Sequence, residues 1–152
     1  MVLDASARPV HDQAMPVTQG FNHIATMTAD LDRLIKFYAD AFGGEVTFEI
    51  AKTDDHPRMV NIELGGGAGL NVFEVSSGSI IGERRRMGGR GPIDHFGIAV
   101  DSRATLEGLR ERMVAAGAEI GEIQRLGNIW SLFFRDPDGM ELEVCAYAFP
   151  ED

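Results

Sequence analysis

The chain has 152 residues, of which 44% are apolar and 25% charged, a composition typical of one globular domain or of two small half-domains that share a core. Its formal net charge of −10 argues against nucleic acid as a partner, because a basic face supplies most of the affinity for a polyanion. No apolar run approaches the roughly 18–20 residues that a membrane helix needs, so no membrane partner is expected either.

Residues 1–18 contain two prolines and no hydrophobic period, so we expect a loose N-terminal tail or an arm that lies over a partner. The segment lacks the basic-then-apolar order of a secretory signal. The single cysteine, Cys145, cannot form an internal disulfide, which favours a reducing compartment. Together these features predict a cytoplasmic protein.

Residues 19–78 are predicted to form a first module in the order strand, helix and three strands. A helix over residues 31–42 follows from one apolar stripe at steps of three and four, with Thr28 or Asp30 as N-cap and Gly43-Gly44 as the stop. The stripe consists of Leu31, Leu34, Ile35, Tyr38 and Phe42. The strands are expected at Phe21–Met27, Glu45–Ile50, Arg58–Leu64 and Leu70–Val75.

Residues 92–148 repeat this order as a second module. Ser102 is the expected N-cap of a helix that ends at Gly117, with an apolar stripe of Leu106, Leu109, Met113 and Val114. The strands are expected at Ile93–Val100, Glu119–Gln124, Asn128–Phe134 and Met140–Ala146, the last two joined by a turn at Asp136–Gly139. Two copies of so small a unit are expected to pair, because one copy alone buries little surface.

Residues 79–91 form the expected linker between the modules. They hold the one basic cluster of the chain, Arg84, Arg85, Arg86 and Arg90. This cluster is either a solvated part of the linker or a mobile lid that meets an anionic group of a substrate.

Each module carries a histidine near its start and a glutamate near its end. Glu74 follows His23 by 51 residues, and Glu143 follows His95 by 48. A lone strand histidine is more often a hydrogen-bonded core residue than a ligand, but the joint occurrence favours one cavity lined by all four side chains. Two imidazoles and two carboxylates suit a divalent metal ion as cofactor, namely Zn²⁺, Ni²⁺, Co²⁺, Mn²⁺ or Fe²⁺.

Strand alternation supports a cavity at the second pair. His95 shares its face with Gly97 and Ala99, whose small side chains leave space above the imidazole. On the last strand, Glu141 and Glu143 share the face opposite the apolar one. That face is either solvated or turned toward the same cavity as His95.

The first pair gives a weaker pattern. His23 shares its face with Ala25 and Met27, which are small to medium in size. Glu74 ends an otherwise apolar stripe, so its carboxylate either reaches water at the sheet edge or has a partner.

The strand over residues 128–134 offers two candidate pocket walls. One face carries Trp130, Leu132 and Phe134, and the other carries Ile129, Ser131 and Phe133. Either set could line an apolar pocket, and plain core packing is the alternative. The expected substrate pocket consists of Met27, Trp130, Phe134 and Glu141.

The chain resembles the vicinal oxygen chelate superfamily over about residues 20–147. The likeness rests on His23 with the helix containing Phe37-Tyr38, on Ile93-Asp94-His95, and on the stretch from Phe134 through Asp136–Gly139 to Glu141-Leu142-Glu143. It implies an α+β fold in which two paired βαβββ modules form a cupped, half-open β-barrel with helices outside. It also implies a homodimer, in some members with modules paired across subunits, and a metal held by His23, Glu74, His95 and Glu143.

Two departures bear on the reaction that the resemblance implies. Glutathione-dependent glyoxalase I has an arginine where this chain has Met27 and an asparagine where it has Gly78. Glutathione chemistry is therefore disfavoured. Dioxygenases of the superfamily use two histidines and one carboxylate, so the joint presence of Glu74 and Glu143 argues against that class.

Two functions follow from the resemblance. The first is a metal-dependent lyase or isomerase that acts on a small oxygenated substrate, with Glu143 or Glu74 as general base and the metal stabilising an enediolate-like charge. The alternative is a metal-free protein of the bleomycin-resistance type that binds and sequesters an antibiotic or another natural product.

Overall fold

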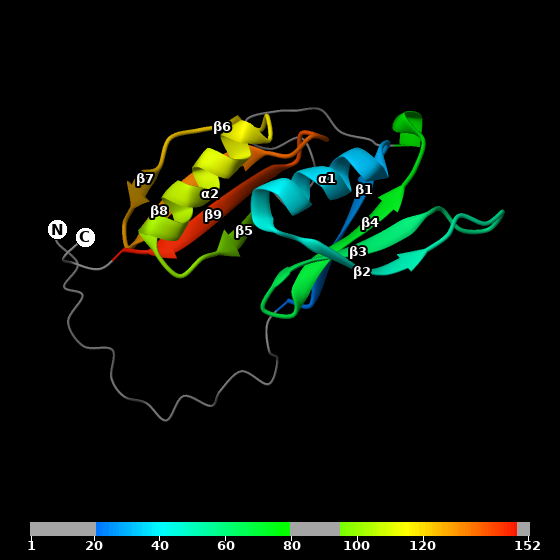
Figure 1. The fold of residues 1–152 in the computed structure, drawn as a ribbon, viewed down its shortest axis with the longest axis horizontal. Helices are drawn as coiled ribbons and strands as arrows, with labels where there is room; N and C mark the ends of the chain where they lie inside the picture. The colour runs from blue at the N-terminus through cyan, green and yellow to red at the C-terminus, as the bar shows by residue number, and fades with distance from the viewer. Residues whose placement is uncertain (1–20, 80–94, 149–152) are drawn as a thin grey trace, which may run out of the picture.

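The computed structural model describes residues 21–79 and 95–148, which form two β-sheets and two helices (Figure 1). The predicted tail over residues 1–18 and the arginine cluster of residues 84–90 lie outside the described residues. Among the described residues, no helix is long and apolar enough to cross a membrane.

The first sheet contains four strands in the order β1-β4-β3-β2. Strand β1 runs parallel to β4, and the other neighbours are antiparallel. The elements are β1 (His23–Thr28), α1 (Leu31–Phe42), β2 (Glu45–Ile50), β3 (Met59–Gly65) and β4 (Ala68–Glu74), followed by a short 3-10 helix, η1 (Ser77–Ser79). This is the predicted order of strand, helix and three strands.

Helix α1 has the bounds that the apolar stripe predicts. The side chain of Asp30 caps it by accepting a hydrogen bond of 3.0 Å from the backbone N–H of Arg33. Gly43 ends it with φ of 68°, a left-handed conformation that glycine adopts without strain. The buried face consists of Leu31, Leu34, Phe37, Tyr38 and Ala41.

The second sheet repeats the plan with strand order β5-β9-β8-β6. Strand β5 runs parallel to β9, and β8 is antiparallel to its neighbours. The elements are β5 (Phe96–Ala99), α2 (Arg103–Ala115), β6 (Glu119–Ile120), β7 (Gln124–Leu126), β8 (Ile129–Arg135) and β9 (Glu141–Tyr147). Ser102 caps α2, as predicted, by accepting from the backbone N–H of Thr105.

The single strand predicted at Glu119–Gln124 is wrong, because the chain forms two short strands there. Ile120 pairs with Phe134, and Gln124 pairs with Ser131. The segment from Ile120 to Gln124 therefore advances by four residues where the facing part of β8 advances by three. One extra residue on one side of a ladder is a β-bulge, which locally interrupts the pairing.

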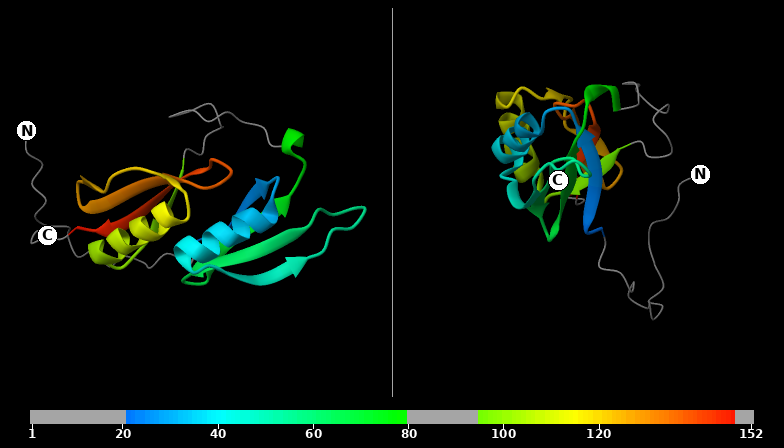
Figure 2. Two further views of the ribbon diagram at one scale, coloured as in Figure 1. Left: turned by 45° about the horizontal axis from the view of Figure 1, so that its top comes forward. Right: turned by 90° about the vertical axis from the view of Figure 1, so that its right-hand side faces the viewer.

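The two halves share one hydrophobic core on the helix side. Helices α1 and α2 lie against each other, and each also packs on a sheet (Figure 2). The ring of Phe134 in β8 lies 6.3 Å from that of Phe37 and 5.4 Å from that of Phe42, both in α1. The guanidinium of Arg112 in α2 donates to the backbone carbonyl of Asp40 at 3.3–3.4 Å. The halves therefore form one body.

The sheets do not close into a barrel, which corrects the expected cupped, half-open barrel. In the described part of the chain, β1 and β5 each pair with one strand only, so each leaves an open edge. In the described part of the chain, no helix packs on the face of each sheet opposite its own helix, and we call these two surfaces the open faces. Closure would need the open edges to meet, and within one chain they do not pair.

Candidate functional site

His95 and Glu143 meet on the open face of the second sheet. The parallel pairing of β5 with β9 sets Gly97 opposite Glu143, and His95 lies two residues before Gly97. Because side chains two apart share a face, the imidazole and the carboxylate point the same way. Their Nε2 and Oε2 atoms are 3.3 Å apart.

Glu143 is held by its neighbours. The hydroxyl of Ser131, itself only 1% exposed, donates to Oε1 of Glu143, which is 8% exposed. The thiol of Cys145 is the next neighbour on β9. Burial, followed by its hydrogen bond to Glu143, raises the pKa of this thiol to about 12, so it stays protonated at neutral pH. The ring of His95 lies edge-on to Phe133, with 5.0 Å between centroids.

The His95–Glu143 geometry fits one edge of a metal site. Two donors bound at about 2.1 Å with an angle of about 90–110° lie roughly 3.0–3.4 Å apart, which includes the observed 3.3 Å. Within residues 21–79 and 95–148, however, no three His, Cys, Asp or Glu side chains lie close enough together to hold one metal ion. The single chain therefore supplies two of the predicted donors together.

His23 lies on the open face of the first sheet, on β1. It pairs with Gly69 of β4, and its Nδ1 is 3.0 Å from Oδ1 of Asn22. Met27, 49% exposed, occupies the same face further along β1. The structure thus leaves His23 and Met27 on an open face, as strand alternation predicts, but does not bring His23 to His95.

Glu74 lies on the other side of this sheet. It pairs with Thr28, five residues beyond His23 on β1, which is roughly 17 Å along the strand and on the opposite face. Its Oε1 accepts a hydrogen bond of 3.1 Å from the backbone N–H of Leu31, the first residue of α1. A carboxylate at a helix N-terminus is favourable, since it satisfies an otherwise unpaired donor and meets the positive end of the dipole. Its contact is a helix cap.

Asn71 occupies the position in the first sheet that Glu143 occupies in the second. It lies on β4 two residues beyond the partner of His23, opposite Ala25. Asn71 follows His23 by 48 residues, the same separation as between His95 and Glu143. Sequence reasoning that searched for a second carboxylate missed this residue, although the equal spacing could have found it.

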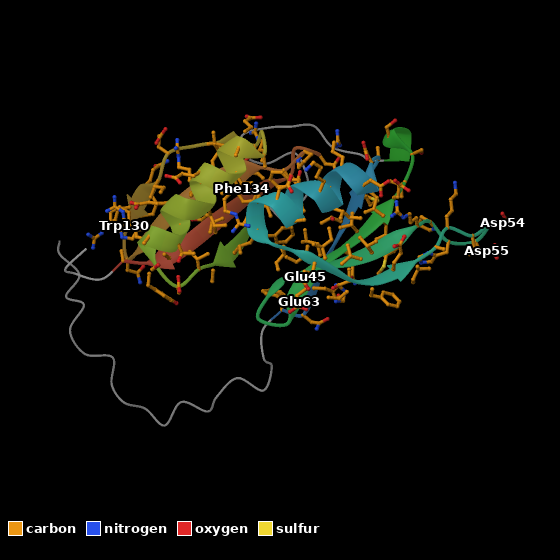
Figure 3. All side chains as sticks on the ribbon, in the orientation of Figure 1. Glu45, Asp54, Asp55, Glu63, Trp130 and Phe134 are labelled. Carbon is orange, nitrogen blue, oxygen red and sulfur yellow. The ribbon has the colours of Figure 1, made fainter. Side chains whose placement is uncertain are left out.

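Two residues of the predicted substrate pocket belong to the helix side (Figure 3). Trp130 pairs with Ala146 and lies 4.1 Å from the guanidinium carbon of Arg103, which stacks over its ring. Phe134 is 2% exposed within the shared core. Both therefore pack on the helix side, and of the two predicted pocket walls the open face carries the one formed by Ile129, Ser131 and Phe133. Glu141 shares the face of Glu143 and pairs with Arg135 at 3.3 Å.

Comparison with known proteins gives a family match over most of the chain. The model of the Glyoxalase/Bleomycin resistance protein/Dioxygenase superfamily matches residues 20–144. A curated relative, the probable chloroplastic lactoylglutathione lyase of Arabidopsis thaliana, is 30% identical over 125 residues, which are 80% of this chain and 34% of the relative. The chain thus spans about a third of that relative's length.

Solved structures share the fold. A glyoxylase/bleomycin resistance protein/dioxygenase domain from Frankia sp. EAN1pec is 27% identical with a TM-score of 0.72, over 86% of this chain and 98% of that one. A variant of the fosfomycin resistance protein FosX from Listeria monocytogenes, complexed with Mn(II) and 1S,2S-dihydroxypropylphosphonic acid, is 21% identical with a TM-score of 0.64, over 88% and 95%. In that structure, the FosX variant thus binds a divalent metal and a small molecule.

Proposed function

The chain belongs to the glyoxalase/bleomycin resistance protein/dioxygenase superfamily, and from this premise we propose that it is a metal-dependent lyase or isomerase acting on a small oxygenated substrate. The observation that carries the proposal is the pair of His95 and Glu143, whose facing atoms are 3.3 Å apart on an open face. The names of the Arabidopsis lyase and of the Mn(II)-bound FosX support a lyase-type reaction and a divalent metal, respectively.

The proposed ligand set is His23, His95 and Glu143. Glu74 is omitted, because its carboxylate caps α1 on the far side of the sheet. The contact of His23 Nδ1 with Asn22 would hold the imidazole with Nε2 outward, which is how a partner of the second ring nitrogen orients a ligating histidine. Two imidazoles and one carboxylate suit Mn²⁺, Fe²⁺, Co²⁺, Ni²⁺ or Zn²⁺.

When bound there, a divalent metal would act as a Lewis acid toward two neighbouring oxygens of the substrate. The chain's own contribution to proton transfer is assigned to Glu143. Its Oε1 accepts from the hydroxyl of Ser131, so Oε2 is the atom that would bind the metal, and it would accept a proton once the carboxylate is displaced from the metal.

The substrate is proposed not to be a glutathione adduct. Met27 stands on the open face beside His23, where an arginine would be needed to bind a glutathione carboxylate, and it offers no positive charge. A substrate of this site would be bound through its oxygens and apolar surface.

We further propose that a second copy of the chain completes the site, so that the His23 face of one copy meets the His95 face of the other. Large apolar side chains on the open faces are exposed in the single chain, and exposed apolar patches of this kind mark surfaces that a partner covers. They are Met27 at 49%, Phe48 at 54% and Tyr147 at 71%, and Phe21, just before β1, is 88% exposed. The open edges of β1 and β5 offer unpaired backbone groups for the same contact.

The test is a metal titration of the full chain purified without chelators or a histidine tag. We expect about one Co²⁺ per chain in the wild type, retained in Glu74→Gln and lost in His23→Ala and His95→Ala. Metal content that stays unchanged in His95→Ala would overturn the proposal. A second experiment tests for the reaction. A panel of small 2-oxo acids, 2-hydroxy acids and 2-oxoaldehydes is incubated with the protein in deuterated water, with and without glutathione. NMR measures the exchange of substrate protons for deuterium.

A dioxygenase is the second candidate, because the ligand set without Glu74 also matches the one used by that class. Two histidines and one carboxylate are the donor set of non-haem Fe(II) oxygenases, and the argument against this class rested on Glu74. Oxygen uptake by the Fe²⁺-loaded protein with a panel of catechols distinguishes it from the lyase.

A further inference from the structure

Asn71 sits at the centre of a polar ladder that crosses the open face of the first sheet. The hydroxyl of Thr47 on β2 donates to Oδ1 of Asn61 on β3 at 2.7 Å. The amide nitrogen of Asn61 in turn donates to Oδ1 of Asn71 on β4 at 2.8 Å. Three strands thus contribute one continuous chain of hydrogen bonds that ends at Asn71.

In the arrangement that the structure shows, the ladder leaves one polar atom of Asn71 available. Its Oδ1 is turned toward β3 by the contact with Asn61. Because the two polar atoms of a planar amide point in different directions, Nδ2 is turned away from β3, and it carries two N–H donors. Among the residues that the structure describes, Nδ2 donates to no other group.

The two halves therefore offer opposite chemistry at equivalent positions. Glu143 presents a carboxylate, which only accepts hydrogen bonds, beside His95. Asn71 presents an amide N–H at the position with the same relation to His23. A donor at this place cannot replace a metal-binding carboxylate, but it can stabilise a negatively charged oxygen.

We propose that Asn71 Nδ2 donates a hydrogen bond to an anionic oxygen of the substrate, a carboxylate or enolate oxygen adjacent to the metal, and that the residue is not a metal ligand. This inference rests on the proposed function. It narrows the substrate class to compounds with an anionic oxygen next to the oxygens that the metal holds. Thr47 and Asn61 act as positioning residues, since they orient the Asn71 amide without touching the substrate.

The experiment separates metal binding from oxyanion binding. Co²⁺ affinity is measured by titration of the metal-free full chain. Oxalate is the probe anion, because it carries negatively charged oxygens on neighbouring carbons. Its affinity is measured from the visible absorption of the Co²⁺-loaded protein. The main variant is Asn71→Asp, which has the same shape and can still accept from Asn61. We expect oxalate affinity to fall by about 10- to 100-fold, the range for loss of a hydrogen bond to a charged oxygen, and Co²⁺ affinity not to fall.

Two further variants complete the design. Asn71→Ala should weaken oxalate binding similarly with Co²⁺ affinity unchanged within about threefold, and Thr47→Val should weaken oxalate binding by a smaller factor. Glu74→Gln is the matched control and should leave both affinities unchanged. A tenfold loss of Co²⁺ affinity in Asn71→Ala would make Asn71 a ligand and overturn the inference. Unchanged oxalate affinity in Asn71→Asp overturns the inference alone, whereas a wild type that binds no Co²⁺ overturns the proposed function and the inference with it.

Discussion

The phenol of Tyr38 donates a hydrogen bond of 3.2 Å to Oδ2 of Asp136, and this contact joins helix α1 of the first half to the β8–β9 turn of the second. Both residues are buried, at 0% and 4% exposed. Oδ1 of Asp136 accepts from the backbone N–H groups of Asp138 and Met140, so the carboxylate also shapes its own turn. This buried pair is thus one of the contacts that fix the relative position of the two halves.

Removing the phenol should destabilise the fold. Tyr38→Phe leaves a buried carboxylate without one of its donors, which costs about 1–3 kcal/mol in the free energy of unfolding. Urea denaturation of both proteins measures the difference. The exposed pair of Lys36 and Asp40 serves as control, since Lys36→Gln should cost less than about 0.5 kcal/mol. Equal effects of the two substitutions would contradict the importance of the Tyr38 contact.

The same carboxylate predicts a pH dependence of stability. Burial raises the pKa of Asp136 from 3.8 to about 6, so the folded state holds its proton more tightly than the unfolded state. Its contribution to stability is therefore fully present below pH 4 and is lost as pH rises through 6, by an amount on the order of 3 kcal/mol. The measurement is the difference in unfolding free energy between wild type and Asp136→Asn at several pH values. That difference should shift against the wild type between pH 4 and pH 7, and a difference independent of pH would refute the prediction.

Ser131→Ala should weaken metal binding without unfolding the protein. The hydroxyl of Ser131 orients Glu143, and loss of a group that orients a ligand typically lowers metal affinity by about 10- to 100-fold. Co²⁺ titration measures the loss. Ser131→Thr keeps a hydroxyl and should recover part of the affinity. Equal Co²⁺ affinity in the alanine variant and the wild type would show that Glu143 needs no such support.

Glu74→Ala should reduce stability while the metal content stays the same. The substitution removes the acceptor of the Leu31 N–H at the start of α1, at a cost of about 1 kcal/mol. Thermal unfolding and metal analysis of the same sample make the comparison. Loss of metal from this variant at unchanged stability would restore Glu74 to the ligand set.

Tyr147→Asp or Met27→Asp should convert the proposed dimer to a monomer. A charge placed on an open face would be buried without a partner in the assembly. Light scattering after size-exclusion chromatography measures the mass. Val114→Asp is the control, because Val114 is similarly exposed, at 53%, but lies on helix α2. A wild type that is monomeric at all concentrations would refute the proposed assembly.

Local patterns predicted the elements well, since each depends on neighbouring residues. The stripe of α1, the Asp30 cap and the Gly43 stop are set by steps of three to four residues, and the helix has the predicted bounds. The bulge that divides β6 from β7 could not be predicted, because it depends on how Ile120 and Gln124 pair with another strand.

The site was predictable only where spacing and register agree. The His95–Glu143 pair follows from strand alternation, and the structure brings the two together. Glu74 was chosen by residue type, although it stands three positions beyond the equivalent of Glu143, which is Asn71. The alternation of side chains along the strand left open which face of the sheet carries Trp130. Its pairing with Ala146 in the structure assigns it to the helix side.

The placement of the shared core has a consequence for how the protein can evolve. The large buried side chains lie almost entirely between the helices and the sheets, while the open faces carry little of the packing that holds the fold. Substitutions on the open faces can therefore accumulate with small effects on stability, and new specificities can arise there one residue at a time. The residues that hold the fold and those of the open faces are thus largely different sets, and Ser131 and Glu143, which are buried on an open face, belong to both.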